Sequence, residues 1–110
     1  MEKHLLLIRH STAEDVTNSS MVRDFDRELT SKGIMESARV GKYLKDSGLA
    51  IDGIYCSPSI RTKTTASLVA EQLKFDTDNI VLSETLYGSG PRGYLSLLNG
   101  LENHLNTVII

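Results

Sequence analysis

Two side chains suited to phosphoryl chemistry stand next to each other near the N-terminus of the chain. Arg9 and His10 directly follow the apolar run at residues 5–8. A guanidinium can bind two oxygens of a phosphoryl group at once, and a neutral imidazole nitrogen can attack phosphorus. The pair therefore predicts a phosphate site, and a surface histidine at the end of a strand is the alternative interpretation.

A second arginine occupies a comparable place after the next apolar run, residues 51–56. Arg61 lies in the segment 57–65, where Ser57 and Pro58 predict a helix with Ser57 as its N-cap. If both runs are parallel strands, their carboxyl ends lie at one edge of the sheet, so Arg61 would lie near Arg9 and His10. Two guanidiniums could then hold the phosphoryl oxygens while His10 attacks in line, aided by the helix dipole. An exposed helical arginine is the alternative.

The elements that must position these residues follow from the hydrophobic pattern. Apolar runs predict four strands, at residues 5–8, 51–56, 80–82 and 107–110, and the first and last are expected to be buried on both faces. Three helices are predicted between them: one over residues 30–45 with Thr30 as N-cap and Gly48 as its stop, one after Pro58, and one after the glycine-rich link 88–91. The expected buried faces consist of Ile34, Ala38, Gly41 and Leu44; of Ile60, Thr64, Leu68, Val69 and Leu73; and of Tyr94, Leu97, Leu98 and Leu101.

This alternation of strands and helices predicts an α/β fold with three layers, α/β/α, around a mainly parallel central sheet. The 110 residues fit a single domain. Residues 11–29 are polar and irregular, and we interpret them as a long loop over the end of the first strand. Loops of this length in compact domains are commonly functional.

Composition limits the possible partners. The chain has 12 Lys and Arg against 14 Asp and Glu, and aromatic residues make up 5% of it, so the basic stripe and stacking surface of a nucleic-acid-binding protein are not expected. No apolar run approaches the roughly 20 residues of a membrane helix, and the N-terminal run is too short for a signal peptide. The single cysteine, Cys56, excludes an internal disulfide and is expected to be a buried hydrophobe. Cytoplasm is the predicted compartment.

Three segments in the same order resemble motifs of the histidine phosphatase superfamily, also called the phosphoglycerate mutase-like family. Residues 7–11 resemble its R-H-G signature, residues 26–33 its D-x-x-L-T-x-x-G block, and residues 57–65 its S-P-x-x-R-x-x-x-T element. The chain is most similar to the SixA-type phosphohistidine phosphatases, which have little inserted between these motifs. The resemblance implies a phosphoglycerate mutase-like fold, a phosphohistidine intermediate on His10, Arg9 and Arg61 in the phosphate pocket, and neither metal nor cofactor.

The activity implied by this resemblance is removal of phosphate from a phosphohistidine protein or a similar phosphorylated substrate. His10 would be the nucleophile, Arg9 and Arg61 would bind and stabilise the phosphoryl group, and Ser11 is also expected to contact the substrate. Two alternatives stay open: a phosphomonoester phosphatase or mutase of the same superfamily, and a non-catalytic phosphate-binding interaction module.

Several residues bear on the match to the family. Ser11 stands where the family usually has glycine, so the backbone there is less free to approach phosphate. Mutase-like relatives place a glutamate after the third strand, which makes Glu84 the possible general acid, with Asp15 as a weaker candidate. A protonated imidazole leaving group needs no such acid. His4 and His104 are interpreted as structural or surface residues.

The family also has a second pocket histidine just after the fourth strand. This sequence reaches Ile110 before such a histidine. We therefore expect residues 1–110 to be a single histidine phosphatase domain that is truncated before its C-terminal part, with the second histidine beyond Ile110.

Overall fold

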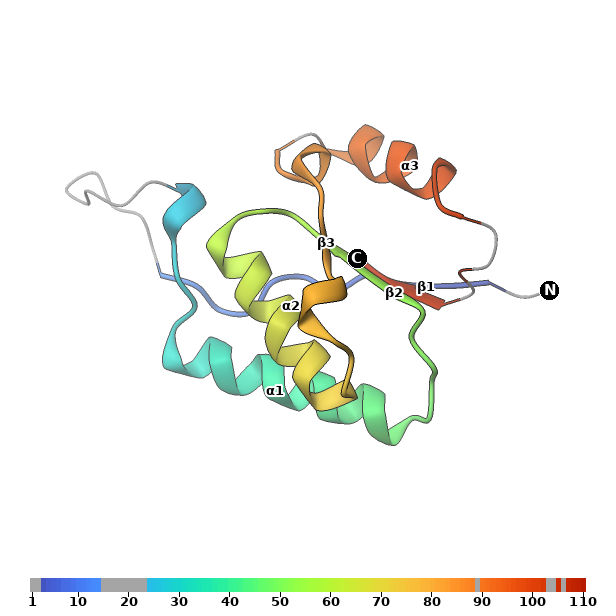
Figure 1. Ribbon diagram of the computed structural model, residues 1–110. Helices are drawn as coiled ribbons and strands as arrows, with labels where there is room; N and C mark the ends of the chain where they lie inside the picture. The colour runs from blue at the N-terminus through green and yellow to red at the C-terminus, as the bar shows by residue number, and fades with distance from the viewer. Residues whose placement is uncertain (1–2, 15–23, 89, 103–104, 106) are drawn as a thin grey trace.

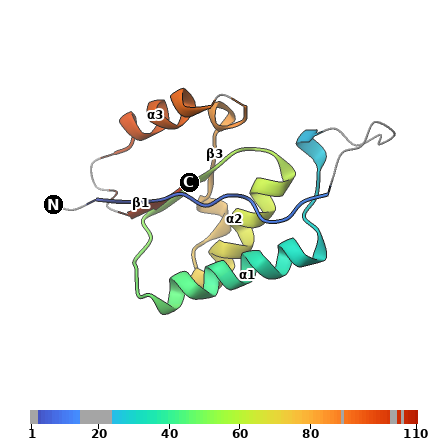
Figure 2. The same cartoon turned by 180° about the vertical axis from the view of Figure 1, so that it is seen from behind.

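The computed structural model describes residues 3–14, 24–88, 90–102, 105 and 107–110. Within them, a parallel sheet lies between two layers of helices (Figure 1). The strands are β1 (His4–Leu6), β2 (Gly53–Cys56), β3 (Val81–Leu82) and β4 (Thr107–Ile109), in the order β1-β4-β2-β3. Helices α1 (Ser31–Asp46) and α2 (Ile60–Leu73) cover one face, and α3 (Pro91–Asn99) covers the other, as the view from behind in Figure 2 also shows. The predicted three-layer α/β/α fold is confirmed.

Three short 3-10 helices complete the described elements: η1 (Asp24–Asp26), η2 (Thr77–Asn79) and η3 (Glu84–Leu86). In the described part of the chain, no helix has the length and apolarity needed to cross a lipid bilayer.

Strand β4 is the centre of the sheet, and its register sets where the site lies. Ile109 pairs with Leu6 of β1 on one side and with Ile54 of β2 on the other. Beyond β1, the Ile8 amide donates a hydrogen bond of 2.9 Å to the carbonyl of Ile110. All of β4 is buried, as expected for this strand. The segments that follow β1 and β2 therefore emerge at the same edge of the sheet.

Strand β1 differs from the prediction that it is buried on both faces. Leu6 and Ile8 pack against the core, but Leu5 is 40% and Leu7 is 67% exposed. Leu5 and Leu7 line open grooves together with residues of the α3 layer, such as Leu98 and Leu95. The reason is that β1 lies at an edge of the described sheet, where α3 covers it only in part.

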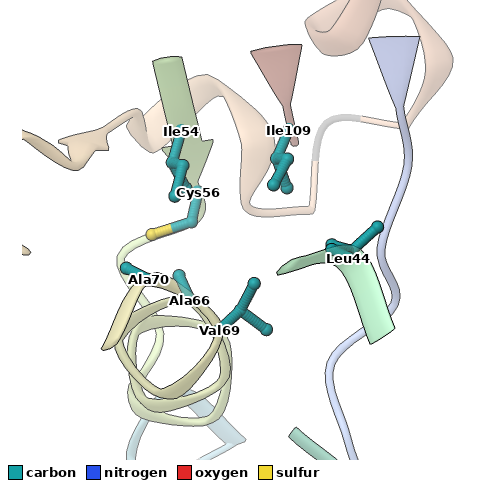
Figure 3. Packing of buried hydrophobic residues seen from close by; sticks show 7 residues of the cluster. All are labelled: Leu44, Ile54, Cys56, Ala66, Val69, Ala70 and Ile109. Carbon is teal, nitrogen blue, oxygen red and sulfur yellow. The ribbon is translucent and has the colours of Figure 1, made fainter. Parts of the chain in front are cut away.

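The main core joins the sheet to α1 and α2. Its buried residues pack together as shown in Figure 3: Leu44, Ile54, Cys56, Ala66, Val69, Ala70 and Ile109. Full burial of a leucine, isoleucine or valine side chain contributes roughly 1.5–3 kcal/mol to the stability of the fold. A smaller cluster beneath α3 consists of Leu86, Val108 and Ile110.

The buried face of α1 consists mainly of small residues. Gly41 and Leu44 are buried as predicted, but Ile34 is 45% exposed, and Gly33 and Ser37 are buried instead. A Cβ atom at Gly41 would lie 2.7 Å from the Gln72 side chain, so only glycine permits this close crossing of α1 and α2. Close packing therefore selects the face with small side chains.

Helix α2 begins two residues later than predicted. Its N-cap is Ser59 rather than Ser57, and Pro58 precedes the helix. The Thr62 hydroxyl lies within hydrogen-bonding distance of the carbonyls of both Ser57 (2.7 Å) and Ser59 (2.9 Å), which holds the segment before the helix in place. Thr30 is the N-cap of α1 as predicted, and its side chain accepts a hydrogen bond from the Gly33 amide.

Candidate active site

His10 lies just past the carboxyl end of β1 and is half-buried. Its Nδ1 atom is 2.8 Å from the carbonyl oxygen of Ser11. A carbonyl oxygen only accepts, so Nδ1 carries the hydrogen of this bond. In the neutral ring the lone pair then lies on Nε2, which is the nitrogen free to act as a nucleophile.

Ser11 connects the His10 segment to both helices of the main layer. The Ser11 amide donates to Oγ1 of Thr65 at 3.2 Å, and the Thr65 hydroxyl donates to the carbonyl of Arg61 at 2.8 Å. The Ser11 hydroxyl lies 2.7 Å from that of Ser37 in α1. The spacing of four residues lets the Thr65 hydroxyl reach the backbone carbonyl one turn earlier in the helix.

Thr12 fixes the same segment to the start of α1. Its carbonyl accepts hydrogen bonds from the Thr30 amide at 2.9 Å and from the Thr30 hydroxyl at 3.2 Å. A Cβ atom on Gly33 would overlap the Thr12 carbonyl, so this contact requires glycine. The motif over residues 26–33 thus supplies the N-cap and the glycine that bring α1 against the His10 loop.

Glu36 binds Thr12 from the exposed side of α1. One carboxylate oxygen accepts from the Thr12 amide at 3.0 Å and from its hydroxyl at 2.7 Å. These two donors, the amide first, hold the pKa of Glu36 below its usual value, and the charges of Lys32 and Arg39 act in the same direction.

Arg61 lies in the first turn of α2, and its Nε atom is buried. Its guanidinium carbon is 6.0 Å from the centroid of the Tyr87 ring. Tyr87 in turn packs edge-on against Phe25 of η1, with ring centroids 5.4 Å apart. Tyr87 follows η3, and its amide donates to the Glu84 carbonyl at 3.0 Å. The loop before α1 and the segment after β3 therefore meet beside Arg61.

Two hollows adjoin His10. A cavity of about 60 Å³ lies between the site and the core, and Thr62 and Thr65 line it together with His10. An open groove of about 490 Å³ on the other side is lined by His10, Arg9 and Arg27. Arg9 is exposed and faces this groove and the one beside α3. The convergence of Arg9 and Arg61 on one anion stays a prediction.

The remaining predicted residues are placed as follows. Glu84 begins η3, directly after β3 as expected, and is exposed. His4 lies in β1 and is exposed. Asp15 and His104 lie outside the described residues. Among those described, no cluster of three His, Cys, Asp or Glu side chains could hold a metal ion.

Cys56 is buried, as predicted. Burial raises the pKa of its thiol to about 11, against an opposing effect of the Lys63 charge. A thiol with this pKa stays protonated near neutral pH and is a poor nucleophile.

Sequence reasoning missed the residues that support the site. Thr65 could have been found, because it is the last residue of the motif over 57–65. No local signal singled out Ser37, Glu36 or Tyr87, since each acts through a partner far away in the sequence.

The layers, the strand order and a histidine at the carboxyl edge of a parallel sheet define a phosphoglycerate mutase-like α/β domain. A family model of the histidine phosphatase superfamily (branch 1) matches residues 5–88. The chain belongs to this superfamily.

Individual relatives support the assignment. The 2,3-bisphosphoglycerate-dependent phosphoglycerate mutase of Afipia carboxidovorans is 32% identical over 91 residues, which cover 79% of this chain and 44% of the mutase. A protein of Agrobacterium tumefaciens assigned as the phosphohistidine phosphatase SixA matches in structure with a TM-score of 0.84 and 23% identity, over 100% of this chain and 69% of that one. A protein of Nakamurella multipartitia, also assigned as SixA, matches in structure with a TM-score of 0.82 and 28% identity. The match covers 97% of this chain and 56% of that one. The chain thus spans less than half the length of the mutase that it matches.

Proposed function

We propose that this domain hydrolyses phosphate from a phosphohistidine protein or a similar phosphorylated substrate, through a phosphohistidine on His10. The observation that carries the proposal is the bond from Nδ1 of His10 to the Ser11 carbonyl, because it leaves the Nε2 lone pair for attack on phosphorus. The relatives assigned as SixA support the choice of phosphohistidine as substrate.

The reaction proceeds in two transfers. Nε2 of His10 forms a bond to phosphorus while the P–N bond of the substrate breaks. The departing imidazole keeps the electron pair on that nitrogen and already carries a hydrogen on its other ring nitrogen, so it leaves as a neutral ring. Water then attacks the phosphohistidine, the P–N bond to His10 breaks, and the electron pair returns to Nε2 as inorganic phosphate is released. Arg9 and Arg61 provide positive charge for the phosphoryl oxygens in both transition states.

The domain's other candidate function is phosphomonoester hydrolysis or mutase chemistry. It is favoured by the relationship to the Afipia mutase and by the position of Glu84 directly after β3. An alkoxide leaving group needs a proton, which Glu84 would have to supply, whereas an imidazole does not.

Paired assays on a phosphohistidine protein and on p-nitrophenyl phosphate distinguish these functions. We expect higher kcat/KM on the phosphohistidine protein, and Glu84→Gln should leave that activity unchanged. A preference for the ester that Glu84→Gln abolishes would establish the second function, and binding of phosphate with no turnover of either would indicate the interaction module. The cytoplasmic compartment stays a prediction.

A further inference from the structure

We propose that the hydroxyl pair Ser11–Ser37 positions the nucleophile, by fixing the carbonyl that receives the Nδ1 hydrogen of His10. Ser37 is a positioning residue in this proposal, since it acts on His10 only through Ser11. The inference rests on the proposed function for its kinetic test, but its structural test is independent of turnover.

The direction of the hydrogen bonds can be worked out from Ser37. The Ser37 hydroxyl donates to the Gly33 carbonyl, four residues earlier in α1, at 2.9 Å. Its one hydrogen is then used, so in the pair of hydroxyls 2.7 Å apart the Ser11 hydroxyl is the donor. Ser37 is 0% exposed, so bulk water does not reach this position to accept the hydrogen of the Ser11 hydroxyl in place of Ser37.

The other side of Ser11 is held in the same way by α2. Thr65 donates to the Arg61 carbonyl, four residues earlier in its helix, and this leaves its oxygen to accept from the Ser11 amide. Each helix thus presents one hydroxyl oxygen, oriented by its own backbone, to one donor of Ser11. The carbonyl of Ser11 shares its planar peptide group with the Thr12 amide, which Glu36 holds, and Ser11 is fixed further through its own amide and hydroxyl. His10 Nδ1 lies 2.8 Å from this carbonyl.

This arrangement gives Ser11 a role that glycine cannot fill. A glycine at this position keeps the bond from its amide to Thr65 but has no donor for Ser37. The loop would keep its bonds to Thr65, Glu36 and Thr30 but lose the one to Ser37, so the Ser11 carbonyl that holds the His10 ring would be less firmly fixed. We expect a mixture of the two neutral ring tautomers in place of the single Nδ1–H form.

The test uses Ser37→Ala and Ser11→Gly, singly and together, with Ser47→Ala as matched control. Ser47 donates to the Leu44 carbonyl at the opposite end of α1. Nitrogen-15 NMR of the histidine ring reports the His10 tautomer, and His10→Ala assigns its signals. Steady-state kinetics with the phosphohistidine protein gives kcat and KM.

The expected result is loss of the pure Nδ1–H form in both single variants but not in Ser47→Ala. The value of kcat should fall about 3- to 10-fold with little change in KM, which corresponds to one hydrogen bond of ordinary strength. The double variant should resemble either single one, because both remove the same interaction. Circular dichroism and thermal unfolding separate this result from misfolding of Ser37→Ala, and Ser11→Gly, being in the loop, provides the test if that variant does not fold.

Folded variants that retain the Nδ1–H tautomer and the normal kcat would overturn the inference while leaving the proposed function intact. Failure of the proposed function looks different: the unaltered protein would show no His10-dependent turnover, although the tautomer could still respond to Ser37→Ala.

Discussion

His10 and Arg61 lie at the same edge of the sheet but are held by different kinds of contact. The His10 segment is fixed by directional hydrogen bonds to Thr65, Ser37 and the start of α1. Arg61 packs near the face of an aromatic ring, that of Tyr87. The difference matches the tasks proposed for the two residues. A nucleophile must present one nitrogen along one line, whereas a planar guanidinium presents a fork of several donors to the phosphoryl oxygens.

The largest expected effect comes from replacing the guanidinium. Arg61→Lys keeps the charge but loses the planar fork, so we expect kcat to fall on the order of 10²-fold with the fold intact. Arg92→Lys, an exposed position on α3, is the control and should be silent. Normal kinetics in Arg61→Lys would place Arg61 outside the phosphate pocket and remove one side of the comparison.

The next largest effect is expected where the backbone of α1 packs closely against the His10 loop. The new methyl group of Gly33→Ala would overlap the Thr12 carbonyl and push α1 away from the His10 loop. We expect a loss of about 1–3 kcal/mol in the free energy of unfolding, measured by urea denaturation, as for other overpacked sites. Gly100→Ala is the control, since its Cβ would make only ordinary contacts of 3.6 Å. Equal stability in the two variants would show that the loop does not need this close approach.

Loss of the aromatic contact of Arg61 is expected to lower activity by a smaller factor. Tyr87→Leu removes the ring beside Arg61, and the loss of a partly exposed cation–π contact of about 0.5–1 kcal/mol corresponds to roughly a 2- to 5-fold fall in kcat/KM. Tyr87→Phe keeps the ring and should retain the activity. If both variants lose activity equally, the Tyr87 hydroxyl and not the ring is what matters.

The smallest effect concerns pH. The pKa of Glu36 is lowered in the folded state, so its contribution to stability is present above the usual glutamate pKa and is lost as the pH falls through the lowered value. Glu36→Gln should therefore have a lower urea midpoint than the unaltered protein at pH 7, and the two midpoints should approach each other below about pH 4. A constant difference between them at all pH values would assign the effect to packing.

The sequence predicted the parts of the fold that local chemistry determines. Thr30 as N-cap, Gly41 and Leu44 on the buried face of α1, and a buried fourth strand all follow from residue type and spacing. The exposure of Leu7 did not follow, because it depends on how far α3 extends over the sheet. The choice of Ser59 over Ser57 as N-cap was likewise beyond the pattern, since serine is a good capping residue at either position.

In the candidate site, too, local pattern indicated some residues, whereas others depend on how distant segments pack together. His10 and Arg61 were proposed from the sequence because their residue types carry chemistry and because parallel strands end at a common edge, and Ser11 was proposed from the family motif. Ser37 and Tyr87 were not found, because a serine in a helix and a tyrosine after a turn have no distinguishing local pattern. Their importance arises only when α1 and η3 are packed against the segments that hold His10 and Arg61. The second pocket histidine, expected after Ile110, stays a prediction.

The most direct test of the account is to look for the phosphoryl group on His10. Brief exposure to a phosphohistidine protein labelled with ³²P should leave acid-labile, base-stable phosphate on the chain, and peptide mapping should locate it at His10. The label should be absent from His10→Ala and present in His4→Ala, which changes the first residue of β1. Undiminished labelling of His10→Ala would contradict the assignment of His10 as the nucleophile.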